Sequence, residues 1–586
     1  MINNFDDTRN APPTIAKPNA EARDIDELFA GKIFRVPNYQ RNYAWDKKNW
    51  DDFWSDIREG LETNTEHYWG TITLKVTDGT YYCEEEDKYF KVYEVVDGQQ
   101  RLTTIYLFLL ALSNKGKPIL KKRFIKCGNI YRLELGGLNG QFLKDLVDGK
   151  NPTPTTKTNR LLRECLEFFE NQIDTFKRID DLSRYLQKIT FSLEFVVQDQ
   201  TLAVKAFESL NDRGKPLTLL DKTKSYLMFF SLRYLNNKLN GCINDVFGNI
   251  FTNYDIIKEI GEQEDIDYIR SARFTEDELL RFFYHYFGHY AIQTYKLPIG
   301  YNYDATANDV FEIFLKKSCN YLKNDPKLED FIKEFLEGLD KFVKSFREVI
   351  GEVKTNCKIK KLFSFLGLNT RAYPLLISLK TENLLDNSML ELLETLDLRV
   401  YKIRGTDPRA DLYRDCISKI KLNPDYNQIV NGIKDFINWF MDDPTFQHYL
   451  NGSLYKNPAV KYILWEYEKY LDLSFDDCNY PLYKICQVEH IFPEEPTLNF
   501  PAYQFNDERE YIANIHRLGN LCLLEENINK KLQNKIPQNK IQGYQKSAIF
   551  RTRQLGYDID NNRFDKEDIN RITKEIIDFC LKRWKI

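Results

Sequence analysis

Over the first 230 residues, hydrophobic and polar positions show two kinds of pattern, one typical of strands and one typical of helices. Two runs rich in Val, Tyr and Thr, residues 70–76 and 89–96, predict strands. A nearly unbroken apolar run over residues 102–112 predicts a buried helix. Residues 21–230 are therefore expected to form an α+β domain. A further helix with one aromatic face against the core is predicted from Trp50, Phe53, Trp54, Ile57 and Leu61.

The rest of the chain is dominated by helical patterns. Residues 1–20 are polar and contain proline, so we expect a flexible lead. Residues 231–430 predict a helical middle that couples the two ends, and residues 431–586 a mostly helical C-terminal domain. His285 and His289 are one helical turn apart, but no HExxH pattern accompanies them and Phe and Tyr surround them. A packed helix is the favoured interpretation there.

A polar turn connects the second predicted strand to the buried helix. It consists of Asp97, Gly98, Gln99, Gln100 and Arg101. Backbone N–H groups at a helix start attract anions, and an arginine can contact phosphate with two parallel hydrogen bonds. The alternative is a tight turn in which Asp97 caps the helix. The residues alone leave both interpretations open.

A second cluster of polar residues lies near the C-terminal end. A strand over 484–491 carries Glu489 beside His490, a second strand is predicted over 519–524, and a short helix over 525–535 carries Asn529. An imidazole is a suitable general base, and carboxylate and amide oxygens are ligands for Mg²⁺ or Mn²⁺. The cluster therefore predicts phosphodiester hydrolysis. The alternative is a structural histidine followed by an Asn-rich helix.

Composition limits where nucleic acid can bind. The 586 residues carry a net charge of −4, so binding must use local basic patches. Residues 530–553 contain seven Lys or Arg and no acid, next to the predicted cluster. A solvated face is the alternative for any such run. The candidate DNA contacts are Lys530, Lys531, Lys535, Lys540 and Lys546.

Cysteine spacing and hydropathy indicate the cellular compartment of the protein. The eleven cysteines form no CxxC pair, so we expect neither a zinc site nor a disulfide framework. No stretch approaches the roughly 18 apolar residues of a membrane span. These features predict a cytoplasmic protein with reduced thiols.

The C-terminal stretch QVEHIFP … HRLGNLCLLEENINKK resembles the ββα-metal fold of HNH endonucleases. The resemblance implies that Glu489 and Asn529 bind the metal, His490 is the base and Asn520 holds the loop. Many relatives have Asp where this chain has Glu489, a longer ligand that should still reach the ion.

The N-terminal motifs resemble the corresponding domain of GmrSD-type (type IV) restriction proteins. They are VVDGQQRLTT, the upstream YQRNYAW and the downstream FESLNDRGKPLTLLD. The resemblance implies a ParB/sulfiredoxin-like fold, with nucleotide binding and hydrolysis at residues 97–101. It also assigns to the first motif Gln40, Arg41, Tyr43 and Trp45, and to the third Asn211, Arg213 and Gly214.

Together the two resemblances imply a single-chain fusion: a nucleotide-regulated, metal-dependent HNH endonuclease that cleaves modified phage DNA. A nucleoside triphosphate such as ATP or GTP would be its second cofactor. A homodimer would suit double-strand cleavage, because two antiparallel strands need two active sites. The alternatives are an RNA- or tRNA-cleaving nuclease and a nucleotide-responsive DNA-binding sensor with weak nuclease activity.

Overall fold

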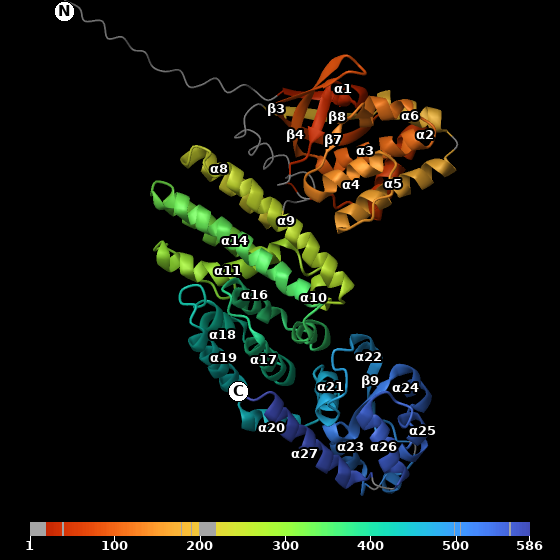
Figure 1. Cartoon of the computed structure of the whole chain (residues 1–586), viewed down its shortest axis with the longest axis vertical. Coiled ribbons are helices and arrows are strands. Elements are labelled where there is room, and N and C mark those ends of the chain that lie inside the picture. The colour runs from red at the N-terminus through yellow and green to blue at the C-terminus, as the bar shows by residue number, and fades with distance from the viewer. Residues whose placement is uncertain are drawn as a thin grey trace, which may run out of the picture. The chain divides into compact units, whose positions relative to one another are not determined.

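The structure is a computed structural model that describes residues 19–37, 40, 42–176, 178–188, 190–197, 218–496, 498–503, 505–561 and 564–586. The chain divides into two compact units (Figure 1). Unit 1 comprises residues 1–259 and 323–336, and unit 2 comprises residues 260–322 and 337–586. Helices α9 (Asn240–Gln263) and α14 (Lys327–Glu352) each contribute residues to both units.

A mixed six-stranded sheet forms the centre of unit 1. Its strand order is β1-β8-β3-β4-β2-β7, with β3 antiparallel to β4 and parallel to β8. The strands are β1 (Asn19–Asp24), β2 (Lys32–Arg35), β3 (His67–Cys83), β4 (Lys88–Asp97), β7 (Leu133–Glu134) and β8 (Thr190–Val197). The two strands predicted at residues 70–76 and 89–96 are confirmed as parts of β3 and β4.

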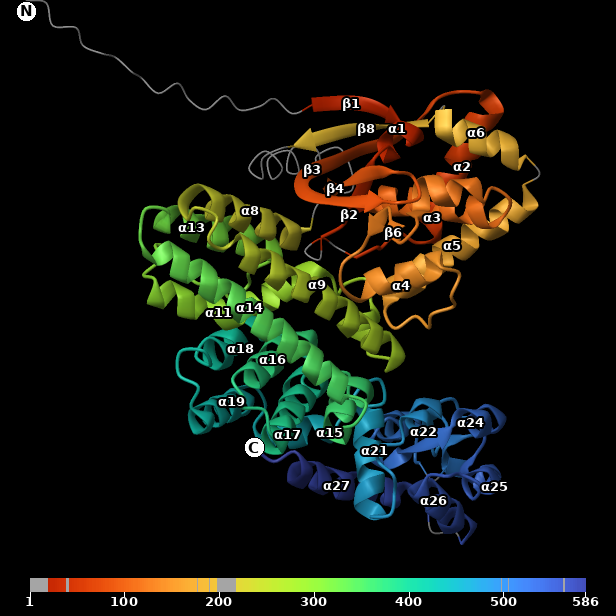
Figure 2. The same cartoon turned by 45° about the horizontal axis from the view of Figure 1, so that its top comes forward.

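Helices cover one face of this sheet (Figure 2). The aromatic stripe of α2 packs into the same core as α3, as its spacing predicts, and Trp50, Phe53, Trp54 and Ile57 are all buried. The apolar run at 102–112 lies within α3 and is buried throughout. The helices of this layer are α1 (Ile25–Phe29), α2 (Lys47–Thr63), α3 (Gln99–Asn114), α4 (Gly137–Val147), α5 (Lys157–Thr175) and α6 (Ile179–Lys188).

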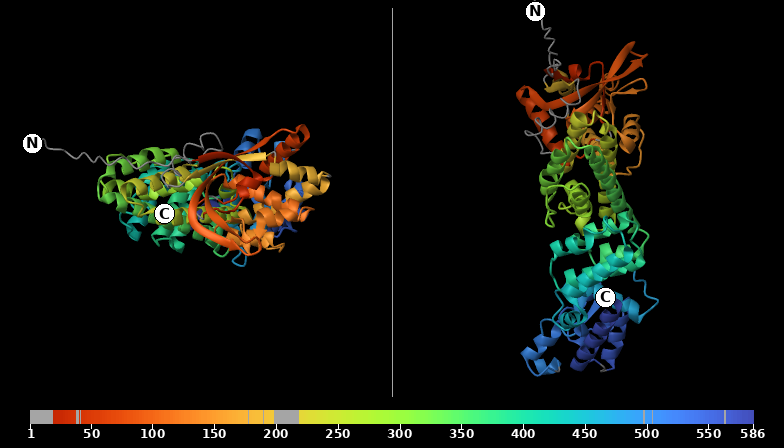
Figure 3. Two further views of the ribbon diagram at one scale, coloured as in Figure 1. Left: turned by 90° about the horizontal axis from the view of Figure 1, so that it is seen from above. Right: turned by 90° about the vertical axis from the view of Figure 1, so that its left-hand side faces the viewer.

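Strands β3 and β4 curve strongly, as the left panel of Figure 3 shows. Their pairing shifts register between Thr73 and Leu74 and again between Val76 and Thr80. Such bulges bend a strand and increase its twist. Strand β4 ends at Asp97, two residues before α3 begins.

The predicted helical middle is confirmed. His285 is buried on α11, and its Nδ1 lies 3.0 Å from the Tyr301 hydroxyl, so it belongs to a packed helix. The helices after β8 and before the C-terminal region are α8 (Leu219–Tyr234), α9, α10 (Asp267–Arg270), α11 (Glu276–Thr294), α12 (Ala307–Asp309), α13 (Lys316–Leu322), α14, α15 (Cys357–Lys360), α16 (Tyr373–Thr381), α17 (Asn387–Leu396), α18 (Arg409–Leu412) and α19 (Tyr426–Met441). Several of them continue as π-helical turns.

The expectation of reduced thiols throughout is wrong for four of the eleven cysteines. Cys83 is paired with Cys127, and Cys357 with Cys478, with Cα–Cα separations of 6.7 and 5.8 Å. The partners are 44 and 121 residues apart in sequence. Pairs this distant leave no CxxC signature, so only the fold brings them together. Among the helices described, none has both the length and the apolar character needed to cross a membrane.

The C-terminal part of unit 2 is mostly helical around a two-stranded sheet, β9 with β10. Three predicted boundaries move: residues 480–485 form a helix before β9, residues 518–520 form a 3₁₀ turn before β10, and Gln533, with a φ of 46°, ends α24 before 535. The elements are α20 (Asp443–Leu450), α21 (Val460–Leu471), α22 (Tyr480–Ile485), β9 (Cys486–His490), α23 (Glu508–Ile515), β10 (Leu521–Glu525), α24 (Glu526–Leu532), α25 (Ile541–Tyr544), α26 (Phe550–Asp560) and α27 (Lys566–Arg583).

Candidate functional site

The two strands of the C-terminal sheet bring the predicted polar residues together. In the antiparallel register His490 pairs with Leu521 and Glu489 with Cys522. Strand β10 is buried along its whole length, and α24 begins directly after it. Glu489 and His490 are therefore fixed at the end of β9 by a strand that is itself part of the core.

Asn520 clamps the turn before β10. Its Nδ2 donates to the carbonyls of Phe492 and Ile515 at 3.1 and 2.8 Å, and its Oδ1 accepts from the Phe492 N–H at 2.9 Å. The side chain is fully buried. These bonds join the segment after His490 to the end of α23, so Asn520 positions the chain without facing the pocket.

Gly519 explains why the turn needs a glycine. A Cβ at this position would overlap the carbonyl of Ile569 on α27. The Gly519 N–H donates to the Thr573 hydroxyl at 2.9 Å. Helix α27 therefore packs directly against the turn that carries Asn520.

The imidazole of His490 is nearly enclosed. Its Nε2 lies 3.0 Å from Nδ1 of His516, and its ring centroid lies 4.0 Å from that of Tyr455. Burial lowers the pKa of His490 to about 3, and the charges of His516 and Lys540 act in the same direction. The ring is unprotonated at neutral pH.

Glu489 forms a buried ion pair. Nζ of Lys540 donates to Oε1 of Glu489 and to the carbonyl of His490, both at 2.6 Å. The side chains of Lys540 and Glu489 are 1% and 10% exposed. Burial raises the pKa of Glu489, while the Lys540 ammonium counteracts this effect. Lys540 therefore anchors the end of β9 from inside the domain.

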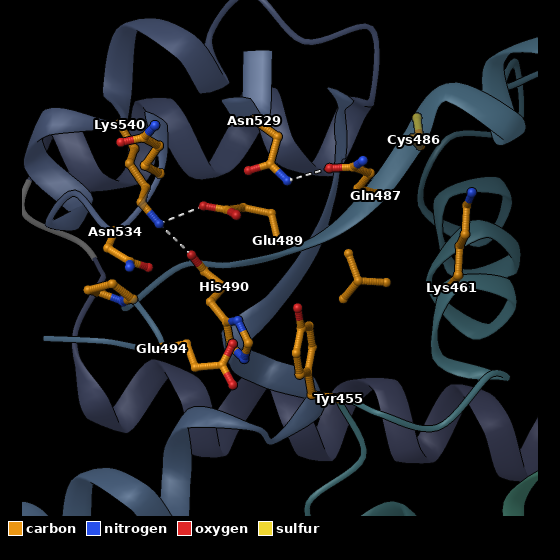
Figure 4. A pocket seen from close by; sticks show the side chains of 13 residues that line it. Tyr455, Lys461, Cys486, Gln487, Glu489, His490, Glu494, Asn529, Asn534 and Lys540 are labelled. Atoms are coloured by element: carbon orange, nitrogen blue, oxygen red, sulfur yellow. Dashed lines mark hydrogen bonds and ion pairs between the residues drawn. The ribbon is translucent and has the colours of Figure 1, made fainter. Parts of the chain in front are cut away.

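Glu489, His490 and Lys540 line one pocket of about 570 Å³ (Figure 4). The carboxylate of Glu489 lies between Lys540 and Asn529 in this view. Asn529 donates through Nδ2 to Oε1 of Gln487 at 3.0 Å, a bond that orients its amide. The side chains around the pocket come from Tyr455, Lys461, Cys486, Gln487, Val488, Glu489, His490, Pro493, Glu494, Asn529, Gln533, Asn534 and Lys540.

The basic run does not form a single solvated face. Lys530, Lys531, Lys535 and Lys546 are exposed, whereas Lys540 is buried against Glu489. Lys530 also pairs with Glu526 one turn earlier on α24. The geometry thus gives Lys540 a different position from the other four candidate DNA contacts.

We predict that replacing the exposed Lys535 and Lys546 by Gln lowers DNA affinity and flattens its salt dependence. For every phosphate that the variant no longer binds, the slope of log affinity against log salt should decrease by about 0.9. Lys327 and Lys344 of α14, also exposed, provide the matched control pair. If both pairs of substitutions changed DNA affinity and its salt dependence equally, the effect would come from net charge rather than from DNA contacts of Lys535 and Lys546.

The Asp97–Arg101 turn is tightly built in unit 1. Gly98 is the N-cap of α3 with a φ of 88°, and a Cβ there would lie 2.8 Å from the Thr71 carbonyl. Gly98, not Asp97, therefore caps the helix. Nη1 of Arg101 donates to the same carbonyl at 3.0 Å. Burial raises the pKa of Asp97, and the Gly98 N–H and Arg101 counteract it.

The first motif is tied to this turn by glutamine side chains. Gln100 accepts from the Ala44 N–H at 2.8 Å and donates to the Asn42 carbonyl at 3.0 Å. Gln40 donates to the Val96 carbonyl at 2.9 Å. The two motifs are adjacent in space although 55 or more residues apart in sequence.

Tyr43 belongs to the core rather than to an open surface. Its hydroxyl contacts Thr104 at 2.8 Å and accepts from Nε1 of Trp50 at 2.9 Å. The residue is 5% exposed. Gln99 begins α3. The predicted residues outside the described part of the chain are Arg41, Asn211, Arg213 and Gly214.

The sequence alone does not place three residues at or beside the C-terminal pocket: His516, Tyr455 and Lys540. His516 opens the stretch that contains Asn520, and only six histidines occur in the chain, which was the available signal. Tyr455 carried no motif. The sequence places Lys540 in the DNA-binding run, because a basic residue in sequence does not reveal a carboxylate partner 51 residues away.

Comparison with known families supports both ends of the chain. Residues 25–228 match the GmrSD restriction endonuclease N-terminal domain, and residues 440–579 match the C-terminal domain of the same endonucleases. The two matches cover more than half of the chain in the order expected for one protein. The chain belongs to the GmrSD restriction endonuclease family. As a GmrSD member it is a restriction-type nuclease whose partner is DNA. No curated protein matches it.

Proposed function

We propose that this GmrSD protein is a nucleotide-regulated, metal-dependent HNH endonuclease that cleaves modified phage DNA. The observation that carries the proposal is the convergence of Glu489, His490 and Asn529 on one pocket, behind a turn clamped by Asn520. A general base and oxygen ligands next to one another are the groups that phosphodiester hydrolysis requires.

The donor set fits a hard divalent cation. Glu489 offers a carboxylate and Asn529 an amide oxygen, and both line the pocket. Oxygen-only donors favour Mg²⁺ or Mn²⁺ over zinc. A bound ion would stabilise negative charge on the phosphate and the leaving oxygen.

The chain's own groups perform the remaining steps. His490, unprotonated at neutral pH, accepts a proton from the attacking water. The negative charge of a bound phosphate raises its pKa toward the working range. Asn520 holds the turn, and the exposed lysines beside the pocket offer contacts to neighbouring phosphates.

Metal titration tests the ligand assignment. Glu489→Gln and Asn529→Ala should each raise the Mg²⁺ or Mn²⁺ concentration for half-maximal cleavage at least about tenfold. Direct binding of Mn²⁺ by calorimetry should weaken in parallel. The control is Glu526→Gln, which also removes one carboxylate charge, but on α24. It should leave both the cleavage titration and the Mn²⁺ binding curve unchanged. Unchanged curves in the first two variants would remove Glu489 and Asn529 from the metal site.

Nucleotide control is proposed at the Asp97–Arg101 turn, where an arginine and a helix start lie close to the half-buried carboxylate of Asp97. Arg101→Ala should abolish nucleoside triphosphate hydrolysis and alter DNA cleavage by roughly five- to 150-fold, the range of typical allosteric coupling. Arg58→Ala, on the exposed side of α2, is the control. Lost hydrolysis with unchanged cleavage would make the two activities independent.

The substrate is tested by incubating the purified chain with plain and modified DNA and with RNA, with each nucleotide and metal. Cleavage of modified DNA alone supports the proposal. Cleavage of RNA or tRNA would replace it by a growth-arresting ribonuclease, and binding without cleavage would make the protein a nucleotide-responsive sensor. A dimer in solution would support paired cutting of two strands.

A further inference from the structure

A second histidine, outside the pocket lining, contacts His490, and the proposed hydrolysis gives it no role. His516 is half-buried at the C-terminal cap of α23, and its Nδ1 lies 3.0 Å from Nε2 of His490. A nitrogen–nitrogen separation of this length is a hydrogen bond. Only one of the two nitrogens carries the shared proton.

The separation is set by the surrounding framework. Asn520 donates to the Ile515 carbonyl, one residue before His516, and bonds both backbone groups of Phe492, two residues after His490. One buried amide therefore joins the two segments that carry the histidines. The 3.0 Å separation of the two ring nitrogens follows from the same clamp that shapes the turn.

Tyr455 fixes the orientation of the His516 ring. The two rings are stacked, with an interplanar angle of 9° and centroids 5.5 Å apart. The Leu454 N–H donates to the His516 carbonyl at 3.0 Å, which ties the tyrosine loop to the histidine backbone. His516 is thus held both by its ring and by its main chain.

We infer that His516 is a positioning residue that accepts a hydrogen bond from Nε2–H of His490 and thereby leaves Nδ1 of His490 as the basic nitrogen. A neutral imidazole has one donor and one acceptor nitrogen, so a proton on Nε2 requires a bare Nδ1. The opposite assignment, with His516 as donor, would occupy the lone pair of Nε2 and place a proton on Nδ1, which leaves His490 no basic nitrogen. The inference rests on the proposed role of His490 as base.

Two substitutions separate hydrogen bonding from packing. His516→Asn keeps an acceptor oxygen near the position of Nδ1 and loses the ring, whereas His516→Phe keeps a ring for Tyr455 and loses the acceptor. We expect His516→Phe to lower kcat for DNA cleavage about 10- to 100-fold with KM unchanged. This loss lies between the effect of removing one neutral hydrogen bond and the effect of a wrong histidine tautomer in a Ser-His-Asp triad. His516→Asn should retain kcat within about fivefold.

Magic-angle-spinning NMR of protein labelled with ¹⁵N-histidine reads the tautomer without any cleavage. His490→Gln identifies the His490 signals among those of six histidines. Native protein and His516→Asn should show the Nε2–H form of His490, and His516→Phe a mixture of forms. His448→Asn, on an exposed histidine of α20, is the matched control for both measurements.

The outcomes are distinct. Normal kcat in His516→Phe, equal losses in the Phe and Asn variants, or an Nδ1–H form of His490 in the native protein would each overturn the positioning role. If His490→Ala still cuts DNA at the native rate, the proposed function fails instead, whatever the His516 variants do.

Discussion

Replacing His490 by alanine should abolish DNA cleavage while leaving DNA binding nearly intact. A general base contributes about two to four orders of magnitude to rate, and kcat should fall by that factor. The substitution leaves the Asn520 clamp and the Glu489–Lys540 pair in place, because Lys540 contacts the backbone carbonyl of His490 rather than its ring. Single-turnover cleavage and filter binding on the same preparation measure the two properties.

His448→Ala is the matched control, since this histidine is exposed on α20. It should cut DNA at the native rate. Cleavage by His490→Ala at normal speed would remove His490 from the role of base, whereas weakened binding would show that the ring supports the DNA surface.

Lys540→Met should cause the largest loss of stability of any substitution at the site. Removing one partner of a buried ion pair costs about 3–5 kcal/mol, because the other charge remains unpaired in the interior. Hydrogen exchange of β9 amides and the thermal unfolding midpoint of the intact chain measure the effect. The double variant Glu489→Gln, Lys540→Met removes both charges and should recover most of the loss.

The loss of stability in Lys540→Met should depend on pH, and the pKa shift of Glu489 gives its direction. Burial raises the pKa of Glu489 in the folded state, so the folded protein holds a proton that the unfolded chain releases. The free energy of unfolding therefore falls as pH rises from the pKa of Glu489 in the unfolded chain to its higher pKa in the folded protein. Loss of the Lys540 ammonium raises the folded-state pKa further and so steepens this fall. The Lys540→Met deficit should shrink toward acid pH, and a deficit independent of pH would contradict the ion-pair explanation.

In unit 1 the local pattern predicts β3, β4, α2 and α3, and its limits are physical. The aromatic residues of α2 recur at helical spacing, and the apolar run of α3 is long enough for a buried helix. Both helices therefore lie where expected. The boundary of β9 moved because Pro481 and the Asn479 cap favour helix over residues 480–485. Short strands contain too few residues for the alternation to outweigh such a signal.

The candidate site was predicted in its residue types but not in its internal contacts. Glu489, His490 and Asn529 line one pocket, as their motif implied. The hydrogen bond of His490 with His516 spans 26 residues, and the ion pair of Lys540 with Glu489 spans 51. No periodicity encodes such interactions, because they depend on how the loops after β9 and α24 return to the sheet.

The packing of α27 against Gly519 has a consequence for synthesis. The β9–β10 hairpin leaves the ribosome before α27, since 48 residues separate Glu525, the end of β10, from Thr573, which bonds Gly519 (573 − 525). At roughly 5–20 residues per second, the hairpin forms about 2–10 s before the helix that supports its turn. A nascent chain that stalls in this interval, or a message that ends early, yields a protein that contains Glu489 and His490 but lacks the helix that packs against the turn. We expect such fragments to cut DNA poorly, because the turn that carries Asn520 lacks its supporting helix.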